Sequence, residues 1–288
     1  MRKKSSMLAL ITILIFITSF SLNIKFALAQ TYNITRVDHT VEILYNGYIL
    51  INDTIELTGQ TPNSFLMGFP YKYGSHLLKC VAYNSSNIFP VNLNVPLENR
   101  IGFYGIEVNL TQGTQVFTVA FVLSNDLLTV SDSVFMLDFP AYPAFTKSVG
   151  NCSISIVLPE GVSNVMVVKD DGIISNLTYS RELSAFIYSP ASVTFSYTGD
   201  KLRLFDVKEL KREIRIGGLG EIEGVDSYYI SSKSPSNIGY VEVVLPPNAT
   251  NPSANDEFGR KMPNVKVVDV EKNRYKVTFS LALESYRS

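Results

Sequence analysis

The sequence of 288 residues contains no tryptophan and only two histidines and two cysteines. A metal centre would have to be built almost wholly from carboxylates, and a redox motif has few thiols to use. Charged residues make up 18% of the chain and the net charge is −1, which excludes a disordered chain and a nucleic-acid-binding protein with a broad basic face. Neither a Gly-x-Ser-x-Gly nor a Ser-x-x-Lys motif occurs, so the common serine nucleophile arrangements have no anchor.

The longest apolar run lies at the N-terminus. Basic residues at positions 2–4 precede the run Met7–Phe20, and Ala27-Leu28-Ala29 stands directly before Gln30. These are the three parts of a secretory signal. We expect residues 1–29 to be a signal peptide or an uncleaved N-terminal anchor. The rest would then be exported, to the extracytoplasmic face of a membrane in the ER lumen or the cell exterior, or secreted. Four of the 25 basic residues lie in this segment, which leaves 21 against 26 acidic ones.

Asn-x-Ser/Thr sequons are frequent in the remaining chain, and they predict a glycoprotein if the chain is exported where such sites are modified. The candidate asparagines are Asn33, Asn52, Asn84, Asn109, Asn151, Asn176 and Asn248.

The two cysteines, Cys80 and Cys152, each lie in an apolar run that is typical of a strand. In an oxidising compartment a disulfide between them would close a loop of about 70 residues and contribute on the order of 4 kcal/mol. The alternative is a pair of buried free thiols. No histidine is placed in the sequence to activate either one.

Short runs rich in Val, Ile, Tyr, Phe and Thr are separated by Gly, Pro, Asn and Asp every 8 to 14 residues, which predicts an all-β protein built from antiparallel β-sandwich domains. The strongest element is a hairpin in which Asn46-Gly47 joins Val41–Tyr45 to Tyr48–Ile51, with a type I′ turn expected. No segment after residue 29 has a persistent helical period, although composition alone allows a short helix over Asp206–Glu213.

The hairpin is predicted to occur twice. When Gly47 is aligned with Gly220, Ile49 falls on Ile222 and Asp53 on Asp226 without gaps. This repeat predicts tandem units, with residues 30–200 as the first β-sandwich domain and residues 201–288 as a second, short or incomplete one.

Catalytic, cofactor-binding and metal-ligating residues are not predicted at any position, so we expect a protein that is not an enzyme. The most distinctive segment is Phe135–Lys147, which is dense in aromatic residues and proline. Phe139, Tyr142 and Phe145 are candidates for a partner or glycan surface, because rigid aromatic rings serve both purposes. The alternative is that these rings fill the core. His39 and His76 are expected to be ordinary surface or edge histidines.

Three segments carry a resemblance to a known family. They are the hairpin at Asn46-Gly47, the segment Phe139–Lys147 leading into Ser153–Pro159, and Gly239–Pro247 followed by Asp256–Gly259. In the same order along the chain, they resemble ribophorin I, an accessory subunit of the oligosaccharyltransferase complex. The family has a C-terminal membrane helix, whereas this sequence has no second apolar span before Ser288, which predicts a fragment or a short relative.

The resemblance implies a non-catalytic, extracytoplasmic subunit that assists protein N-glycosylation. Its partners would be membrane oligosaccharyltransferase subunits or the acceptor polypeptide, and its membrane association would come from partners or from the N-terminal segment. The alternative function is a secreted or cell-surface β-sandwich protein with a structural, adhesive or glycan-binding role. Neither function requires a cofactor or a nucleic acid.

Overall fold

The computed structural model describes residues 32–169, 172–174, 176–199, 202–234 and 236–284. The predicted signal or anchor, residues 1–29, lies outside them. The described part is nearly all β-structure, with two short 3-10 helices, η1 (Tyr71–His76) and η2 (Asn125–Leu127). Within these residues no helix is long and apolar enough to cross a membrane. The predicted all-β class is confirmed.

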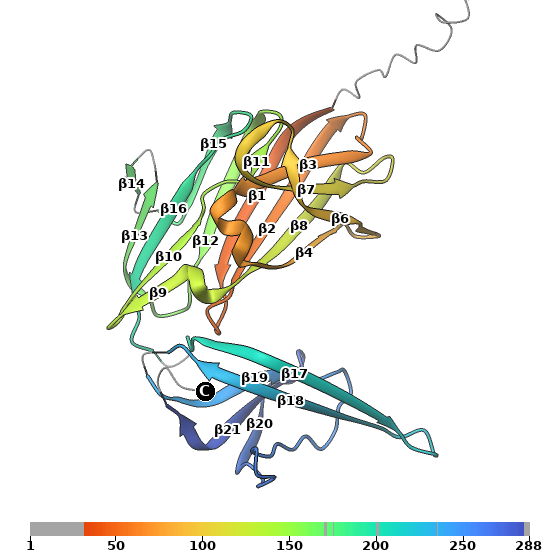
Figure 1. The fold of residues 1–288 in the computed structure, drawn as a ribbon, viewed down its shortest axis with the longest axis vertical. Coiled ribbons are helices and arrows are strands. Elements are labelled where there is room, and N and C mark those ends of the chain that lie inside the picture. The colour runs from red at the N-terminus through yellow and green to blue at the C-terminus, as the bar shows by residue number, and fades with distance from the viewer. Residues whose placement is uncertain (1–31, 170–171, 175, 200–201, 235, 285–288) are drawn as a thin grey trace, which may run out of the picture.

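A seven-stranded sheet forms one layer of the first unit (Figure 1). In spatial order its strands are β15 (Thr178–Leu183), β12 (Val149–Val157), β1 (Tyr32–Ile43), β2 (Ile49–Gly59), β8 (Val116–Leu123), β4 (Leu77–Tyr83) and β5 (Ile88–Phe89). The sheet is mixed, because β1 and β12 run parallel while the other neighbours run antiparallel. The expectation of purely antiparallel sheets is corrected at this one pair.

Two smaller sheets complete the first unit. One contains β14 (Gly172–Ile174), β13 (Ser163–Lys169), β16 (Pro190–Ser196), β10 (Val134–Pro140) and β9 (Leu128–Ser131). The other contains β11 (Ala144–Phe145), β3 (Ser64–Pro70), β7 (Arg100–Asn109) and β6 (Val91–Leu97). The core lies between these layers. On β2 every second residue from Ile49 to Leu57 is buried, the period of a strand with one covered face. Aromatic rings from different sheets meet there, as at Phe65 and Phe117, whose centroids are 5.2 Å apart.

The second unit contains a two-stranded and a three-stranded sheet (Figure 1). The first pairs β17 (Phe205–Ile216) with β18 (Ile222–Ser232), and the second has the order β19 (Ile238–Val244), β21 (Arg274–Leu283), β20 (Asn264–Asp269). The prediction of a short helix over Asp206–Glu213, which rested on composition alone, is wrong because this segment lies within β17. Its helix-forming residues are held extended by register pairing with β18 from Phe205↔Ser232 to Ile216↔Ile222.

The predicted repeat of the hairpin is present in the backbone. Strands β17 and β18 begin and end 173 positions after β1 and β2. The irregularity between Ile34 and Arg36 in β1 recurs between Val207 and Glu209 in β17, again 173 positions later. A local irregularity at the same place in both copies is a specific feature of strand pairing, so it supports a true duplication rather than two unrelated hairpins.

The turn of the hairpin differs from the expected type I′. The N–H of Gly47 donates to the carbonyl of Leu44, and the N–H of Leu44 donates to the carbonyl of Tyr48. Only Gly47 of this turn has a positive φ, at 82°. This is a type I turn followed by a glycine in the left-handed region, the second common hairpin connection. Gly220, with φ 86°, closes the other hairpin through the same two backbone hydrogen bonds.

The repeat extends beyond the hairpin. The three-stranded sheet of the second unit, β19-β21-β20, has the chain order and antiparallel pairing of β3-β7-β6 in the first unit. In the first unit β2 is also paired with β8 and β1 with β12, whereas β17 and β18 pair only with each other among the described residues. The second hairpin therefore has two edges that its counterpart covers with strands.

Candidate binding surface

The predicted aromatic surface is part of the core. Phe139, Tyr142 and Phe145 are each no more than 1% exposed. The ring of Phe145 lies 5.9 Å from that of Phe65, and the hydroxyl of Tyr142 accepts a hydrogen bond of 3.2 Å from Arg181. The expectation that these rings present a partner or glycan surface is wrong. The segment lies between β10 and β12, where the layers meet, so its rings fill the interior.

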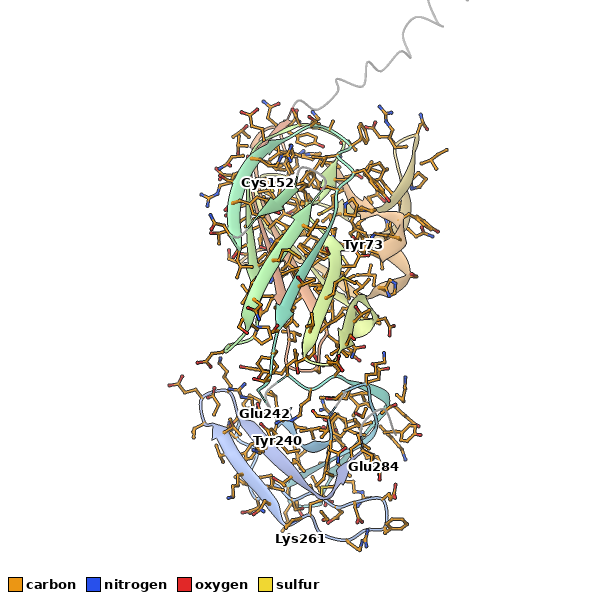
Figure 2. The ribbon with its side chains drawn as sticks, turned by 90° about the vertical axis from the view of Figure 1, so that its left-hand side faces the viewer. Tyr73, Cys152, Tyr240, Glu242, Lys261 and Glu284 are labelled. Atoms are coloured by element: carbon orange, nitrogen blue, oxygen red, sulfur yellow. The ribbon has the colours of Figure 1, made fainter. Side chains whose placement is uncertain are left out.

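The two cysteines cannot form the disulfide. Cys80 lies on β4 and Cys152 on β12, and three strands of the same sheet stand between them. Four strand spacings amount to about 19 Å, whereas bonded cysteines have Cα atoms within about 7 Å. Both thiols are free, and Cys152 is buried in the first unit (Figure 2). Burial raises the pKa of Cys80 to about 12 and also raises that of Cys152, so neither is a ready nucleophile.

His39 is buried, which corrects its expected place at the surface or an edge. Its Nδ1 lies 2.5 Å from Asp53 Oδ1, and its Nε2 lies 3.3 Å from the carbonyl oxygen of Pro140. The two side chains are 1% and 2% exposed, so they are closed to a substrate from solvent. This pair joins β1 to β2 across the sheet, at paired register positions.

The second hairpin contains the counterpart of this pair. Arg212 and Asp226 are paired in register and form a two-pronged ion pair with distances of 2.6 and 2.7 Å. They stand 173 positions after His39 and Asp53. Sequence reasoning aligned the two aspartates but missed their basic partners, which the same alignment also superimposes.

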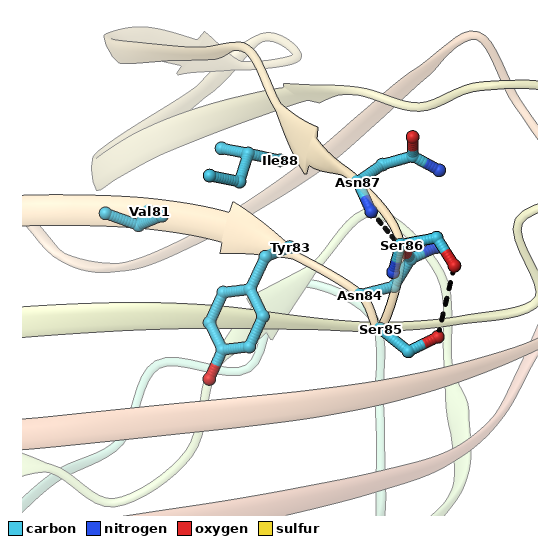
Figure 3. A pocket seen from close by; sticks show the side chains of 7 residues that line it. All are labelled: Val81, Tyr83, Asn84, Ser85, Ser86, Asn87 and Ile88. Atoms are coloured by element: carbon cyan, nitrogen blue, oxygen red, sulfur yellow. Dashed lines mark hydrogen bonds between the residues drawn. The ribbon is translucent and has the colours of Figure 1, made fainter.

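A shallow depression lies at the turn between β4 and β5 and is lined by residues 81 and 83–88 (Figure 3). The turn is held by Asn84, whose side-chain oxygen accepts hydrogen bonds from the N–H groups of Ser86 and Asn87 at 2.9 and 2.8 Å. This places a sequon asparagine at a surface turn. The other six sequon asparagines are also exposed or half-buried.

The most distinctive surface is on the second hairpin, and we call it the hairpin face. It is lined by side chains that are 40% to 75% exposed, namely Leu210, Ile214, Ile216, Ile222 and Tyr228. Their counterparts in the first hairpin are no more than 5% exposed and belong to the core, namely Val37, Val41, Ile43, Ile49 and Ile55. The same pattern of apolar residues is thus covered in one unit and open in the other.

The junction between the units is held by polar contacts around Lys233. Its Nζ lies 2.6 Å from Asp126, 2.9 Å from Asp206 and 3.0 Å from the side-chain oxygen of Asn125. The hydrogen bond from Lys233 lowers the pKa of Asp126. Burial opposes ionisation of Asp206, but its contacts with Lys208 and Lys233 outweigh burial and lower its pKa as well. These groups tie η2 of the first unit to β17 and the end of β18.

Apolar and aromatic contacts add to the junction. Leu202 and Leu204 belong to the core of the first unit, and Leu204 lies against the turn at Gly47. The guanidinium of Arg203 and the ammonium of Lys276 each lie 3.4 Å from the ring centroid of Tyr240 on β19. The segment Leu202–Leu204, which joins the units, therefore contacts the core of the first unit and Tyr240 of the second.

Known proteins give distant structural likenesses to this chain. The sequence matches no known protein family and no curated protein. Among solved structures, an aminopeptidase N family protein from Idiomarina loihiensis is 12% identical with a TM-score of 0.37, over 66% of this chain and 32% of that one. Yeast LTA4 hydrolase in complex with Bestatin is 11% identical with a TM-score of 0.34, over 63% and 29%. A putative protease from Parabacteroides distasonis is 15% identical with a TM-score of 0.27, over 59% and 41%.

These likenesses are distant, and the chain spans between 29% and 41% of the length of those proteins. At such identities and scores they support no statement on function. The resemblance to ribophorin I is wrong, because neither the known protein families nor the curated proteins give that family as a match to this sequence. Its short, permissive segments are of the kind that strands and turns repeat in many all-β proteins.

Proposed function

We propose that the chain is an exported, non-catalytic protein with a structural or adhesive role at the cell surface, and that it acts by binding other polypeptides. The observation that carries the proposal is the duplicated hairpin, whose apolar face is core in one unit and open in the other. A group of exposed apolar side chains on one face is a feature of interaction sites. Sandwich domains in tandem are common in surface proteins.

Two further observations support this function. The N-terminal pattern of basic, apolar and small residues favours export. The junction around Lys233 and Tyr240 holds the second unit against the first, so the hairpin that carries the hairpin face is attached to the first unit by defined contacts. A binding surface on a supported element costs less ordering when a partner binds.

The test is surface exposure followed by cell adhesion. The full chain and a variant without residues 1–29 are expressed in the native host, and intact cells are treated with protease. We expect protease to remove the full chain and to spare the shortened variant, and we expect deletion of the gene to reduce cell aggregation. Protection of the full chain in intact cells would exclude export. Unchanged aggregation in the deletion strain would exclude the adhesive role.

A further inference from the structure

We propose that the outer face of the seven-stranded sheet carries N-linked sugars on Asn33, Asn52 and Asn151, transferred from a lipid-linked sugar donor outside the cytoplasm. We call this surface the sequon face. It consists of the side chains of β15, β12, β1, β2 and β8 that point away from the core. The inference adds a modification to the proposed function and rests on that function only for export of the chain.

The sequon spacing places each asparagine and its hydroxyl partner on the same side of a strand, because residues two apart in a β-strand share a face. Three sequons lie wholly within strands of this sheet, namely Asn33–Thr35 in β1, Asn52–Thr54 in β2 and Asn151–Ser153 in β12. In each of them the middle residue is buried, while the asparagine and the hydroxyl residue are exposed or half-buried. The middle residues therefore face the core, and the sequon side chains face outward.

The strand register gathers these side chains on one surface. Asp38 of β1 is paired with Thr54 of β2 on one side and with Ser153 of β12 on the other. Residues paired across neighbouring strands lie on the same face, so the hydroxyls of two sequons stand in one row. Asn52 stands in the next row, opposite Thr40 of β1. The parallel pairing of β1 with β12 thus brings together sequons that are about a hundred residues apart in the sequence.

The fold accommodates a sugar at these positions. A sugar on a buried asparagine would prevent the layers from closing, whereas a sugar on the outer face leaves the core intact. The side chains of the three asparagines make no hydrogen bond with other groups of the described residues. Asn84 differs, because its side-chain oxygen holds the turn between β4 and β5. The register neighbours of Asn52 are the short residues Thr40 and Ala120, which leave room above its amide.

The composition of the sequon face favours sugars over a protein partner. The row through Asp38 contains further short hydroxyl residues, with Ser180 paired with Ser153 and the hydroxyl of Thr118 2.9 Å from that of Thr54. The centres of protein interfaces are enriched in aromatic residues, which this row of β12, β1, β2 and β8 does not contain. A row of short polar side chains stays hydrated beneath a bulky, hydrophilic sugar chain.

The modification joins one amide to one sugar. A bond forms between Nδ2 of the asparagine and the anomeric carbon of the sugar, and the bond from that carbon to a phosphate oxygen of the donor breaks. The lipid leaves with its phosphate, and the proton lost from Nδ2 passes to a base of the host transferase. The hydroxyl residue of the sequon is required for recognition. Its removal therefore prevents the transfer while the asparagine stays in place.

The test is mass spectrometry of the chain purified from its native host, both intact and as peptides. Thr54→Ala and Thr54→Ser both retain Asn52, but only Thr54→Ser retains the sequon. Ser153→Ala and Ser153→Thr form the equivalent pair for Asn151. Circular dichroism verifies that each variant is folded. A chain without residues 1–29 provides the unmodified reference.

We expect a sugar mass on the peptides that contain Asn33, Asn52 and Asn151. The mass at Asn52 should be lost in Thr54→Ala and retained in Thr54→Ser, and the mass at Asn151 should respond in the same way to the Ser153 pair. Unmodified peptides at all three positions, or equal modification of Thr54→Ala and Thr54→Ser, would overturn the proposal.

The two proposals fail separately. A chain that protease removes from intact cells but that carries no sugar at these asparagines overturns the modification and leaves export in place. A chain that carries the sugars, in a host whose aggregation is unchanged when the gene is deleted, supports the modification and excludes only the adhesive role.

Discussion

Truncation of Ile49 and of Ile222 to alanine is expected to have very different effects, although the two residues occupy the same position of the duplicated hairpin. Ile49 is fully buried and Ile222 is 72% exposed. Removal of three carbons from Ile49 costs about 2.4 kcal/mol at roughly 0.8 kcal/mol per buried carbon, and the residual cavity raises this toward about 4 kcal/mol. At Ile222 just over a quarter of that burial is present, so the loss is about 0.7 kcal/mol.

The assay is urea unfolding of the full chain, followed by circular dichroism and by a probe placed in each unit, since two units need not unfold together. Ile49→Ala should lower the midpoint of the first unit strongly, and Ile222→Ala should leave the midpoint of the second unit almost unchanged. The pair Ile43→Ala and Ile216→Ala serves as a matched replicate, because these residues are 5% and 75% exposed. Comparable losses for Ile49→Ala and Ile222→Ala would refute the reasoning, since they would mean that the hairpin face is covered.

Three further results are expected. Phe145→Ala should destabilise the first unit by about 3–5 kcal/mol in urea unfolding, because its ring is buried; a loss below about 1 kcal/mol would contradict its place in the core. Cys80 and Cys152 should both react with a thiol reagent after unfolding without reductant, whereas a cross-linked pair would contradict the sheet order. Lys233→Met should increase protease cleavage within residues 202–204. In the unsubstituted chain, cleavage of this segment should increase only in acid. The carboxylates of Asp126 and Asp206, whose pKa values are lowered, stabilise the junction above about pH 4, and this stabilisation is lost as the pH falls through the lowered pKa values. Cleavage that does not depend on pH would contradict this expectation.

The elements with strong local signals were predictable from the sequence. The alternation of apolar residues identified the strands around Gly47, and the alignment of Gly47 with Gly220 identified the second hairpin. The turn type was missed, because Asn-Gly also fits a type I turn with glycine in the left-handed region. The helix predicted from the composition of Asp206–Glu213 is wrong for a related reason. Intrinsic helix propensity is a weak signal where pairing with a neighbouring strand determines the backbone conformation.

The candidate site was less predictable, because burial depends on distant segments. Phe139, Tyr142 and Phe145 carry the same local signal whether their rings face solvent or the meeting point of three sheets. The separation of Cys80 from Cys152 depends on the spatial order of strands, which the sequence does not display. The hairpin face is the opposite case. Its apolar residues have the sequence pattern of a buried core, and only the structure reveals that the described chain leaves them exposed.

Hydrogen exchange of individual backbone amides tests the central claim most directly, namely that the second hairpin repeats the first but leaves one edge of β18 unpaired among the described residues. The amides of Gly224, Asp226 and Tyr228 should exchange quickly, and their counterparts in β2 should be strongly protected by pairing with β8. Strong protection of these three amides in the chain alone would contradict the account.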